Sequence, residues 1–383
     1  MPQRRIGVNV LDEAVQRMRE VYEAGHRVVI SFSAGKDSGA CLEVCTIAHA
    51  LAKRNDRIEV VMRDEEIMLP NTFEYAERVA ARDEVDFHWM IANQPIINIY
   101  NRKSPYFWVF DPELPPEQWV RQPPEYAYTI PEKNIDQLIT TKRFPPPEGK
   151  DLVVVMGLRV SESVARRMGL ASSGGYLTKA KNGIRYARPI YDWNYSDIWR
   201  SVAEWGTDYN RIYDTFHKAK LPTSQQRVSP VTMTPSALKG LVIGAQYYPN
   251  WFSKVVRRCD GVRNAVHYGK RAVEPLRRHG ETWSQCYQRT CIDTAPDWIA
   301  ERAVRVRDDV IKKVQRAGLP TLPEVSAAEY GVKGLPQTMQ TWKALAKMMY
   351  GGDPFSLKVS YLPYMEPEYF RKGAGYWGGK PTW

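Results

Sequence analysis

The residue types best suited to chemistry gather in a short segment, 33–38, which reads Ser-Ala-Gly-Lys-Asp-Ser. An apolar run at 28–32 precedes it and predicts a buried β-strand, and a second apolar run at 40–48 predicts a helix directly after it. Small residues allow backbone N–H groups to converge on an anion, and a helix N-terminus adds a partial positive charge to the same point. Lys36 adds a full charge. The segment therefore predicts a phosphate-binding loop.

This loop is not a Walker A motif, which needs Gly-x-x-x-x-Gly-Lys-Ser/Thr. Ile30 occupies the position of the first glycine, and Asp37 follows Lys36. A second interpretation is that Gly, Asp and Ser stand here only because a strand-to-helix turn needs turning and capping residues. Both interpretations stay open on the loop alone.

Strands and helices alternate around this loop. Apolar spacing predicts helices at 11–23 and 72–83, and strands at 57–62, 85–90 and 151–156. Such alternation is typical of an α/β fold, with a parallel twisted sheet and helices on both faces. Ligands of these sheets bind beyond the carboxyl ends of the strands, where both the loop and Asp64 fall.

The pattern divides the chain into two predicted domains. Residues 1–205 hold the alternating elements, and residues 206–383 are predicted to be mainly helical. An insertion at 100–147, rich in proline and aromatic residues, is either a cap over the site or a packing arm. Asn182-Gly183 predicts a hairpin turn, and residues 373–383 predict an extended tail.

Composition and charge limit the class of protein. The chain has 383 residues with a formal net charge of +11, and no apolar run approaches the length of a membrane span. The N-terminus lacks an apolar signal core, so a cytoplasmic protein is expected. The basic excess favours polyanionic partners such as nucleotides, nucleic acid or an acidic protein, although a solvated surface explains it equally well.

The five cysteines are too sparse for a disulfide scaffold. Cys41 and Cys45 lie on one face of the predicted helix and are most simply small buried residues. The other three are possible metal ligands together with His267 or His279, but their spacing matches no short zinc signature. These three are Cys259, Cys286 and Cys291.

Four segments together resemble the phosphoadenosine phosphosulfate (PAPS) reductase branch of the adenine nucleotide alpha-hydrolase-like fold, over about residues 5–215. They are the loop at 33–38, which is similar to the PP-loop Ser-Gly-Gly-x-Asp-Ser/Thr; Asp64 with Pro70-Asn71-Thr72; Gly157-Leu158-Arg159 with Glu162-Ser163 and Arg166; and Pro189–Trp193 with Asp197-Ile198-Trp199. Ala34 departs from the pattern, because it replaces the first glycine of the loop. The resemblance makes residues 1–205 a PP-loop nucleotide-binding domain.

Further residues look like the IbrA-type (immunoglobulin-binding regulator) subgroup and extend the resemblance to about residue 265. They are Trp108–Asp111, Trp119-Val120-Arg121, Tyr248–Trp251, Arg257 and Gly261. This subgroup implies a link to a ParB-like protein partner.

The resemblance implies a role for each matching residue. Ser33, Gly35, Lys36, Asp37 and Ser38 would cradle the phosphates of ATP or PAPS, and Asp37 would also hold Mg²⁺. Ser31 and Phe32 would line the adenine side, and Asp64 would approach the nucleotide. Gly157, Arg159, Arg166 and Arg167 would complete the site, because guanidinium groups bind phosphate or sulfate bidentately. The alternatives are a helix cap for Asp64 and ion pairs with Glu162 for the arginines.

One departure bears on the chemistry. Sulfonucleotide reductases use a Glu-Cys-Gly-x-His motif, which this chain lacks. We therefore expect an enzyme that cleaves ATP between the α- and β-phosphates and adenylylates an unknown substrate, with Lys36, Asp37 and Arg159 as catalytic residues. The alternatives are a PAPS reductase or sulfurtransferase that uses Cys286 or Cys291, and a nucleotide-sensing regulator that binds a ParB-like partner or nucleic acid. The acceptor and the oligomeric state are not predicted.

Overall fold

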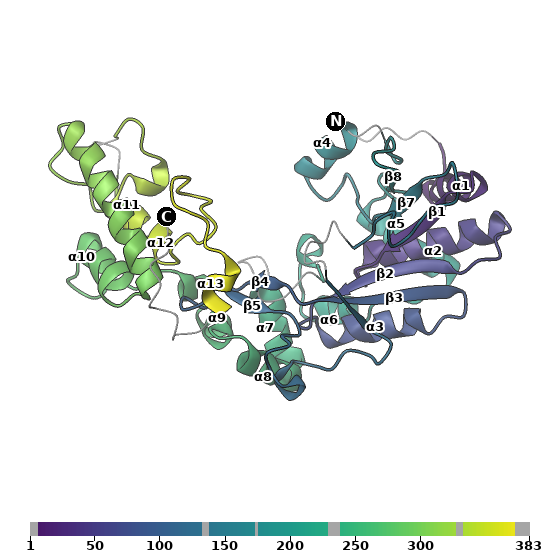
Figure 1. Cartoon of the computed structure of the whole chain (residues 1–383), viewed down its shortest axis with the longest axis horizontal. Helices are drawn as coiled ribbons and strands as arrows, with labels where there is room; N and C mark the ends of the chain where they lie inside the picture. Colours follow the sequence, from purple (N-terminus) through teal and green to yellow (C-terminus); the bar gives the residue numbers. More distant parts are fainter. Residues whose placement is uncertain (1–6, 132–137, 173–174, 229–237, 327–331, 372–383) are drawn as a thin grey trace. The chain divides into compact units, whose positions relative to one another are not determined.

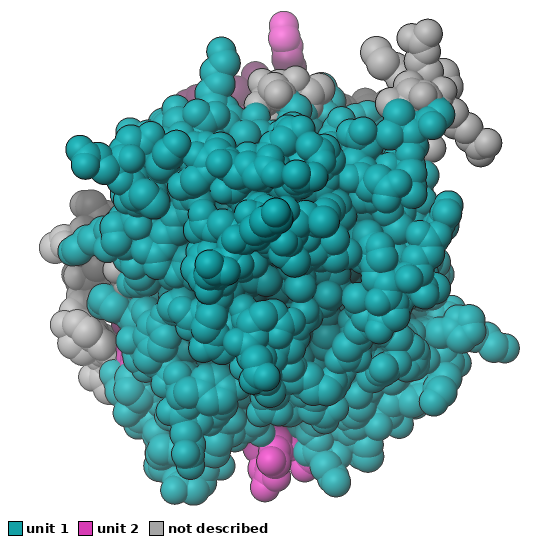
Figure 2. All heavy atoms as spheres, turned by 90° about the vertical axis from the view of Figure 1, so that its right-hand side faces the viewer, with its two compact units in different colours: residues 1–94, 109–231, 246–251 teal, residues 95–108, 232–245, 252–383 magenta. Residues whose placement is uncertain are grey.

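The computed structural model describes residues 7–131, 138–172, 175–228, 238–326 and 332–371. The chain divides into two compact units, coloured separately in Figure 2. The first unit comprises residues 1–94, 109–231 and 246–251, and the second comprises residues 95–108, 232–245 and 252–383. The division into domains at residues 1–205 and 206–383 stays a prediction.

A six-stranded parallel sheet forms the centre of the first unit, in the order β6-β3-β2-β1-β7-β8 (Figure 1). The strands are β1 (Arg27–Ser31), β2 (Ile58–Asp64), β3 (Val85–Ala92), β6 (Tyr128–Ile130), β7 (Leu152–Val155) and β8 (Ile184–Ala187). The chain runs outward from β1 to β2 and β3, and later returns to place β7 on the other side of β1. The loops that follow β1 and β7 therefore leave the sheet at a topological switch point, where α/β proteins bind ligands.

The predicted α/β class is confirmed, and the helices lie close to the expected positions. The first unit has α1 (Val10–Glu23), α2 (Lys36–Leu51), α3 (Pro70–Ala80), α4 (Val164–Ser172), α5 (Tyr195–Trp205) and α6 (Ile212–Lys218), with short 3₁₀ turns at Pro116–Gln118 and Thr223–Gln225. Asn182 and Gly183 both adopt positive φ, 53° and 73°, so the predicted tight turn is also confirmed.

The two faces of the sheet pack against different parts of the chain. Val28, Ile30 and Val60 belong to a core shared with α1, α2, α3 and α5. Val29 and Val61, which alternate with them along the strands, belong to a second core that includes Leu138 and Phe144 of the insertion. The described residues of this second core come from strands and loops.

The second unit is mainly helical, as predicted. It contains the hairpin of β4 (Pro95–Ile97) and β5 (Tyr106–Trp108), most of α7 (Leu238–Tyr247) and α8 (Pro249–Arg258), and α9 (Val262–Tyr268), α10 (Trp283–Tyr287), a π-helix at Gln288–Asp293, α11 (Asp297–Arg316), α12 (Trp342–Met349) and α13 (Pro367–Arg371), together with 3₁₀ turns at Gly269–Val273 and Gln337–Met339. The predicted tail at 373–383 lies outside the described residues. No described helix combines the length and apolar composition that crossing a bilayer requires.

Candidate functional site

The loop between β1 and α2 is folded by the side chain of Ser38. Its hydroxyl accepts hydrogen bonds from the backbone N–H groups of Ser33 and Gly35, both at 3.2 Å, and donates to the Gly35 carbonyl at 3.1 Å. The capping interpretation is therefore correct for Ser38. These bonds already use the Ser33 and Gly35 N–H groups, so the anion-binding interpretation rests on the N-terminus of α2 and on the Lys36 side chain.

Ala34, the departure from the glycine pattern, adopts the conformation that a glycine would favour. Its φ is 54°, in the left-handed region, where an alanine costs roughly 1–2 kcal/mol. The side-chain amide of Asn210 donates to the Ala34 carbonyl at 2.8 Å and holds the turn from outside the loop. The loop therefore keeps its tight turn without its first glycine.

Lys36, Asp37 and Arg159 form one charged group at the start of α2. Lys36 Nζ lies 2.8 Å from Asp37 Oδ2, and Arg159 Nε lies 2.5 Å from Asp37 Oδ1. Burial lowers the pKa of the Lys36 ammonium from its ordinary value, and the neighbouring Asp37 carboxylate opposes that change. The three predicted catalytic residues are thus brought together.

The segment 189–193 positions Arg159 without touching the loop. The Trp193 carbonyl accepts from the Ser161 hydroxyl at 3.0 Å, and that hydroxyl accepts from Arg159 Nη1 at 3.0 Å. Trp193 is itself buried, and neighbouring Asp192 pairs with Arg17 of α1 at 2.6 Å. The 189–193 segment, which contributed to the family resemblance, therefore holds Arg159 in position and does not itself line the cavity.

A cavity of about 750 Å³ opens over the loop. Ten of the twelve predicted nucleotide-site residues line it, and Asp64 and Arg167 do not. Its cations are Lys36, Arg63, Arg159, Arg166 and Arg227; its carboxylates are Asp37, Glu65 and Glu162; its apolar lining includes Val61, Met68, Leu138, Ile139, Val154, Met156 and Leu158. Of the predicted insertion, Leu138 and Ile139 reach the cavity.

Phe32 and Arg166 serve two roles at once. The Phe32 ring packs against Tyr75 and Phe87, with ring centroids 5.7 and 6.1 Å away, so it belongs largely to the core. Arg166 pairs closely with Glu162, as the ion-pair interpretation predicted, and still lines the cavity. Arg167 is exposed on the same helix.

Asp64 is fully buried and binds protein groups. Its carboxylate accepts from the Trp89 indole N–H at 2.7 Å and from the Glu66 backbone N–H at 2.9 Å, and it pairs with Arg121. Glu66 in turn accepts from the backbone N–H groups of Phe110 and Val120, at 2.6 and 3.1 Å. The acids at the end of β2 therefore fasten the 109–121 segment to the sheet.

Several cavity residues were not foreseen from the sequence, among them Glu65, Tyr213 and Arg227. Glu65 replaces Asp64 at the cavity, and burial raises the pKa of its carboxyl. Tyr213, on α6, accepts a hydrogen bond from the Lys36 backbone N–H at 3.0 Å. Arg227 lies in the segment after the 3₁₀ turn at 223–225. The alternation of side chains along β2 could have pointed to Glu65, whereas no local sequence pattern marks Tyr213 or Arg227.

Gly157 allows the end of β7 to approach the loop. A Cβ at this position would lie 2.8 Å from the Asp37 carbonyl carbon and 2.9 Å from the Ser38 nitrogen, both backbone atoms. We expect Gly157→Ala to displace the start of α2 and to lower the free energy of unfolding by about 1–3 kcal/mol.

Chemical denaturation measures this effect, and Gly169→Ala is the matched control. A Cβ at Gly169, inside α4, would meet no atom within 4 Å, so alanine there should be neutral or stabilising by up to about 1 kcal/mol. Equal stability of the two variants would contradict the close approach.

The described residues do not offer a prepared Mg²⁺ site at Asp37. Both oxygens of Asp37 already pair with cations, and no group of three carboxylate, histidine or cysteine ligands is found at the cavity. Mg²⁺ usually binds through one or two carboxylates together with substrate phosphates. Its coordination by Asp37 remains a prediction.

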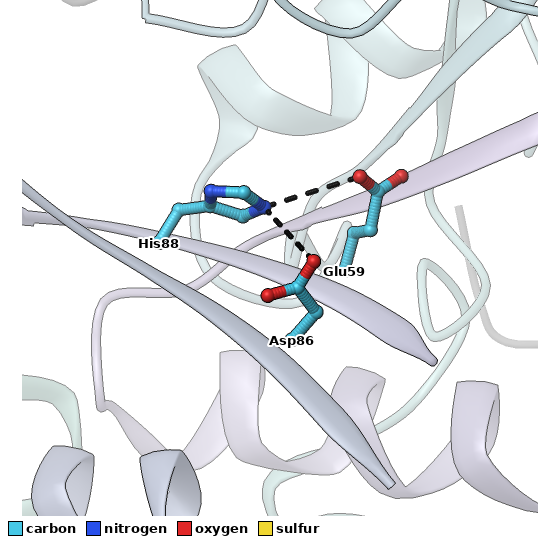
Figure 3. A group of neighbouring side chains, drawn as sticks. All are labelled: Glu59, Asp86 and His88. Carbon is cyan, nitrogen blue, oxygen red and sulfur yellow. Dashed lines mark ion pairs between the residues drawn. The ribbon is translucent and has the colours of Figure 1, made fainter. Parts of the chain in front are cut away.

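One group of possible ligands lies elsewhere on the sheet, formed by Glu59, Asp86 and His88 (Figure 3). Arg27 binds both oxygens of Glu59, His88 Nε2 lies 3.7 Å from Asp86, and His88 Nδ1 lies 3.2 Å from the Tyr128 hydroxyl. These contacts describe a network of ion pairs on the sheet surface. Within the described part of the chain, no such ligand group includes a cysteine.

Comparisons with known proteins were made for the whole chain. No family model matches it. An uncharacterised protein of Escherichia coli (strain K12), YbdN, is 24% identical over 404 residues, which cover 98% of this chain and 96% of that protein.

Solved structures give weaker likenesses. FMN adenylyltransferase of Candida glabrata, in complex with FAD and inorganic pyrophosphate, has a TM-score of 0.34 and 12% identity, over 53% of this chain and 59% of that one. PAPS reductase of Candida auris, as a phosphate complex, has a TM-score of 0.30 and 12% identity, over 55% of this chain and 85% of that one. The function of this chain must therefore be argued from its own site.

Proposed function

We propose that the first unit binds ATP in the cavity over the loop and cleaves it between the α- and β-phosphates, transferring the adenylyl group to an acceptor. One observation carries the proposal: a single cavity joins the loop and its cations to an apolar wall. Lys36 and Arg159 lie on the charged side, and Val154 and Met156 lie among the apolar residues. A volume of about 750 Å³ is within the range of small-molecule sites.

The reaction that fits these groups is a displacement at phosphorus. An acceptor oxygen attacks the α-phosphorus, a new P–O bond forms, and the bond to the bridging oxygen breaks so that pyrophosphate leaves with the electron pair. Lys36 and Arg159 are held in place by Asp37, so they stabilise the growing negative charge without reorganising. The acceptor loses its proton; Glu65, a cavity carboxylate that pairs with Arg63 and whose pKa is raised by burial, is suited to accept it.

The reductase alternative requires a reactive thiolate. Cys286 and Cys291 are both buried, burial raises the pKa of the Cys286 thiol, and burial raises that of Cys291 to about 11. Reactive cysteines have lowered pKa values and access to substrate. No cysteine is among the described residues that line the cavity.

Product analysis with the full-length protein tests the proposal. ATP labelled at the α-phosphate is incubated with Mg²⁺, with and without a small-molecule cell extract as the source of acceptor. We expect pyrophosphate together with labelled AMP or a labelled adenylyl product. ADP and inorganic phosphate would contradict the proposed site of cleavage. Tight binding of ATP with no turnover in either condition would favour the nucleotide-sensing regulator, for which a ParB-like partner and nucleic acid remain predictions.

Cys286→Ser separates the two enzyme classes. We expect the variant to release pyrophosphate at the wild-type rate, within about twofold, because the serine replaces a buried thiol outside the cavity lining. The same proteins are assayed with PAPS and thioredoxin for sulfite. Sulfite formed by the wild type and lost in Cys286→Ser would establish the reductase in place of the adenylyl transfer.

A further inference from the structure

Arg227 is placed beside the phosphate loop by the residues on either side of it. The Gln226 side chain accepts from the Tyr195 hydroxyl at 2.8 Å and donates to the Leu221 carbonyl at 2.9 Å. On the other side, Val228 Cγ2 lies 3.0 Å from the point where a Cβ on Gly35 would stand. Gln226 therefore ties the segment to Tyr195 and Leu221, Val228 packs against the loop, and Arg227, an exposed residue, lines the cavity between them.

The charges around this point do not balance. Asp37 pairs with both Lys36 and Arg159 at the start of α2, so one negative charge faces two positive ones. Glu162 pairs closely with Arg166 and lies 3.8 Å from Arg159. Three cations on this side of the cavity thus share two carboxylates. A fourth, the guanidinium of Arg227, has no ion pair or hydrogen bond with any residue that the structure describes.

The cations also repel one another. Burial lowers the pKa of both Lys36 and Arg166, and the positive charge of Arg227 contributes to the lowering in each case. Three cations that face one cavity are held close without enough negative charge. A polyanion would relieve this repulsion, whereas a single phosphate on the loop would satisfy only the groups nearest to the N-terminus of α2.

We infer that Arg227 is a specificity-determining residue that, with Lys36 and Arg166, recognises the terminal phosphates of a nucleoside triphosphate. The inference rests on the proposed function and extends it to the leaving group. When the bond to the α-phosphorus breaks, the electron pair remains on the departing pyrophosphate, and Arg227 meets that charge. The site should therefore prefer a triphosphate to a monophosphate and should bind free pyrophosphate.

Titration calorimetry on the full-length protein tests the inference with four probes: α,β-methylene ATP, which cannot be cleaved at this position, AMP, inorganic pyrophosphate, and adenosine 3′,5′-bisphosphate. For Arg227→Gln, we expect binding of the triphosphate analogue and of pyrophosphate to weaken by about tenfold or more, as for the loss of a charge-assisted hydrogen bond. Binding of AMP should change by less than about twofold. Arg227→Lys should recover part of the affinity, because it keeps the charge.

Arg167→Gln is the matched control, since Arg167 is an exposed arginine that does not line the cavity. Equal weakening of AMP and of the triphosphate analogue in Arg227→Gln, or no difference from the control, would overturn the inference. Loss of adenosine 3′,5′-bisphosphate binding alone would do the same, and would assign Arg227 to a 3′-phosphate. A different result would contradict the proposed function alone. If pyrophosphate binds selectively and this binding depends on Arg227, but ATP releases no pyrophosphate, the subsite is retained and the transfer reaction is rejected.

Discussion

Replacing Lys36 with methionine will lower the rate of pyrophosphate release from ATP by about 100- to 1,000-fold, the effect of removing one preorganised electrostatic group from a transition state. The Lys36 side chain is only 7% exposed and lies 2.8 Å from Asp37. Its ammonium is held in place before the substrate binds, so a water molecule in the same place would stabilise the transition state less. Methionine keeps most of the length and packing of the side chain.

The matched control is Lys179→Met, which removes an exposed lysine of the first unit that does not line the cavity. It should retain the wild-type rate within about twofold. Steady-state assays of both variants, with thermal unfolding to show that each is folded, provide the comparison. A folded Lys36→Met protein that keeps more than a third of the wild-type rate would remove Lys36 from the proposed mechanism.

The central sheet and the loop could be predicted because their signals are local. The apolar run at 28–32, the small residues of 33–38 and the apolar run at 40–48 follow one another directly, so each can be interpreted without residues far away in the sequence. The loop therefore fixes the position of Lys36 and Asp37 with little help from distant residues. Arg159 could be added because it follows a strand, and parallel strands end at the same edge of the sheet.

The part of the cavity wall that includes Tyr213 and Arg227 could not be predicted in the same way. Tyr213 and Arg227 reach the cavity through the return of the chain after α5, and the contacts that hold them, Lys36 with Tyr213 and Gln226 with Tyr195, join residues far apart in the sequence. No periodic pattern marks such a contact in one sequence. The sequence also left the insertion open between a cap and a packing arm; of its described residues, Leu138 and Ile139 line the cavity.

Asp64 shows how strand alternation resolves a choice that residue type leaves open. Both Asp64 and Glu65 are acids at the end of β2, and either could approach a nucleotide. Val61 and Glu65 line the cavity, whereas Val60 and Met62 belong to the core under the helices. Because side chains alternate along a strand, Asp64 points with Val60 and Met62, away from the cavity.

Asp64→Asn should therefore lower the free energy of unfolding by about 3–5 kcal/mol, the cost of leaving one partner of a buried ion pair without its counter-charge. Arg121 is the group left unpaired, and the rings of Phe73, Trp89 and Phe110 lie within 6 Å of its guanidinium, at 4.6, 5.8 and 5.7 Å. Asparagine is nearly isosteric, so the loss reports the charge and one lost acceptor oxygen rather than shape. Denaturant unfolding measures it.

The matched control is Asp86→Asn on the neighbouring strand, where the carboxylate is 49% exposed and a change within about 0.5 kcal/mol is expected. The two interpretations of Asp64 then differ in a second measurement, because a residue that only fastens the 109–121 segment should leave the affinity of the folded protein for α,β-methylene ATP within about threefold of wild type. A variant of normal stability whose affinity falls tenfold or more would return Asp64 to the nucleotide site. If Asp64→Asn loses stability but keeps its affinity for the ATP analogue, Asp64 has a structural role, and nucleotide binding is left to the opposite face of β2.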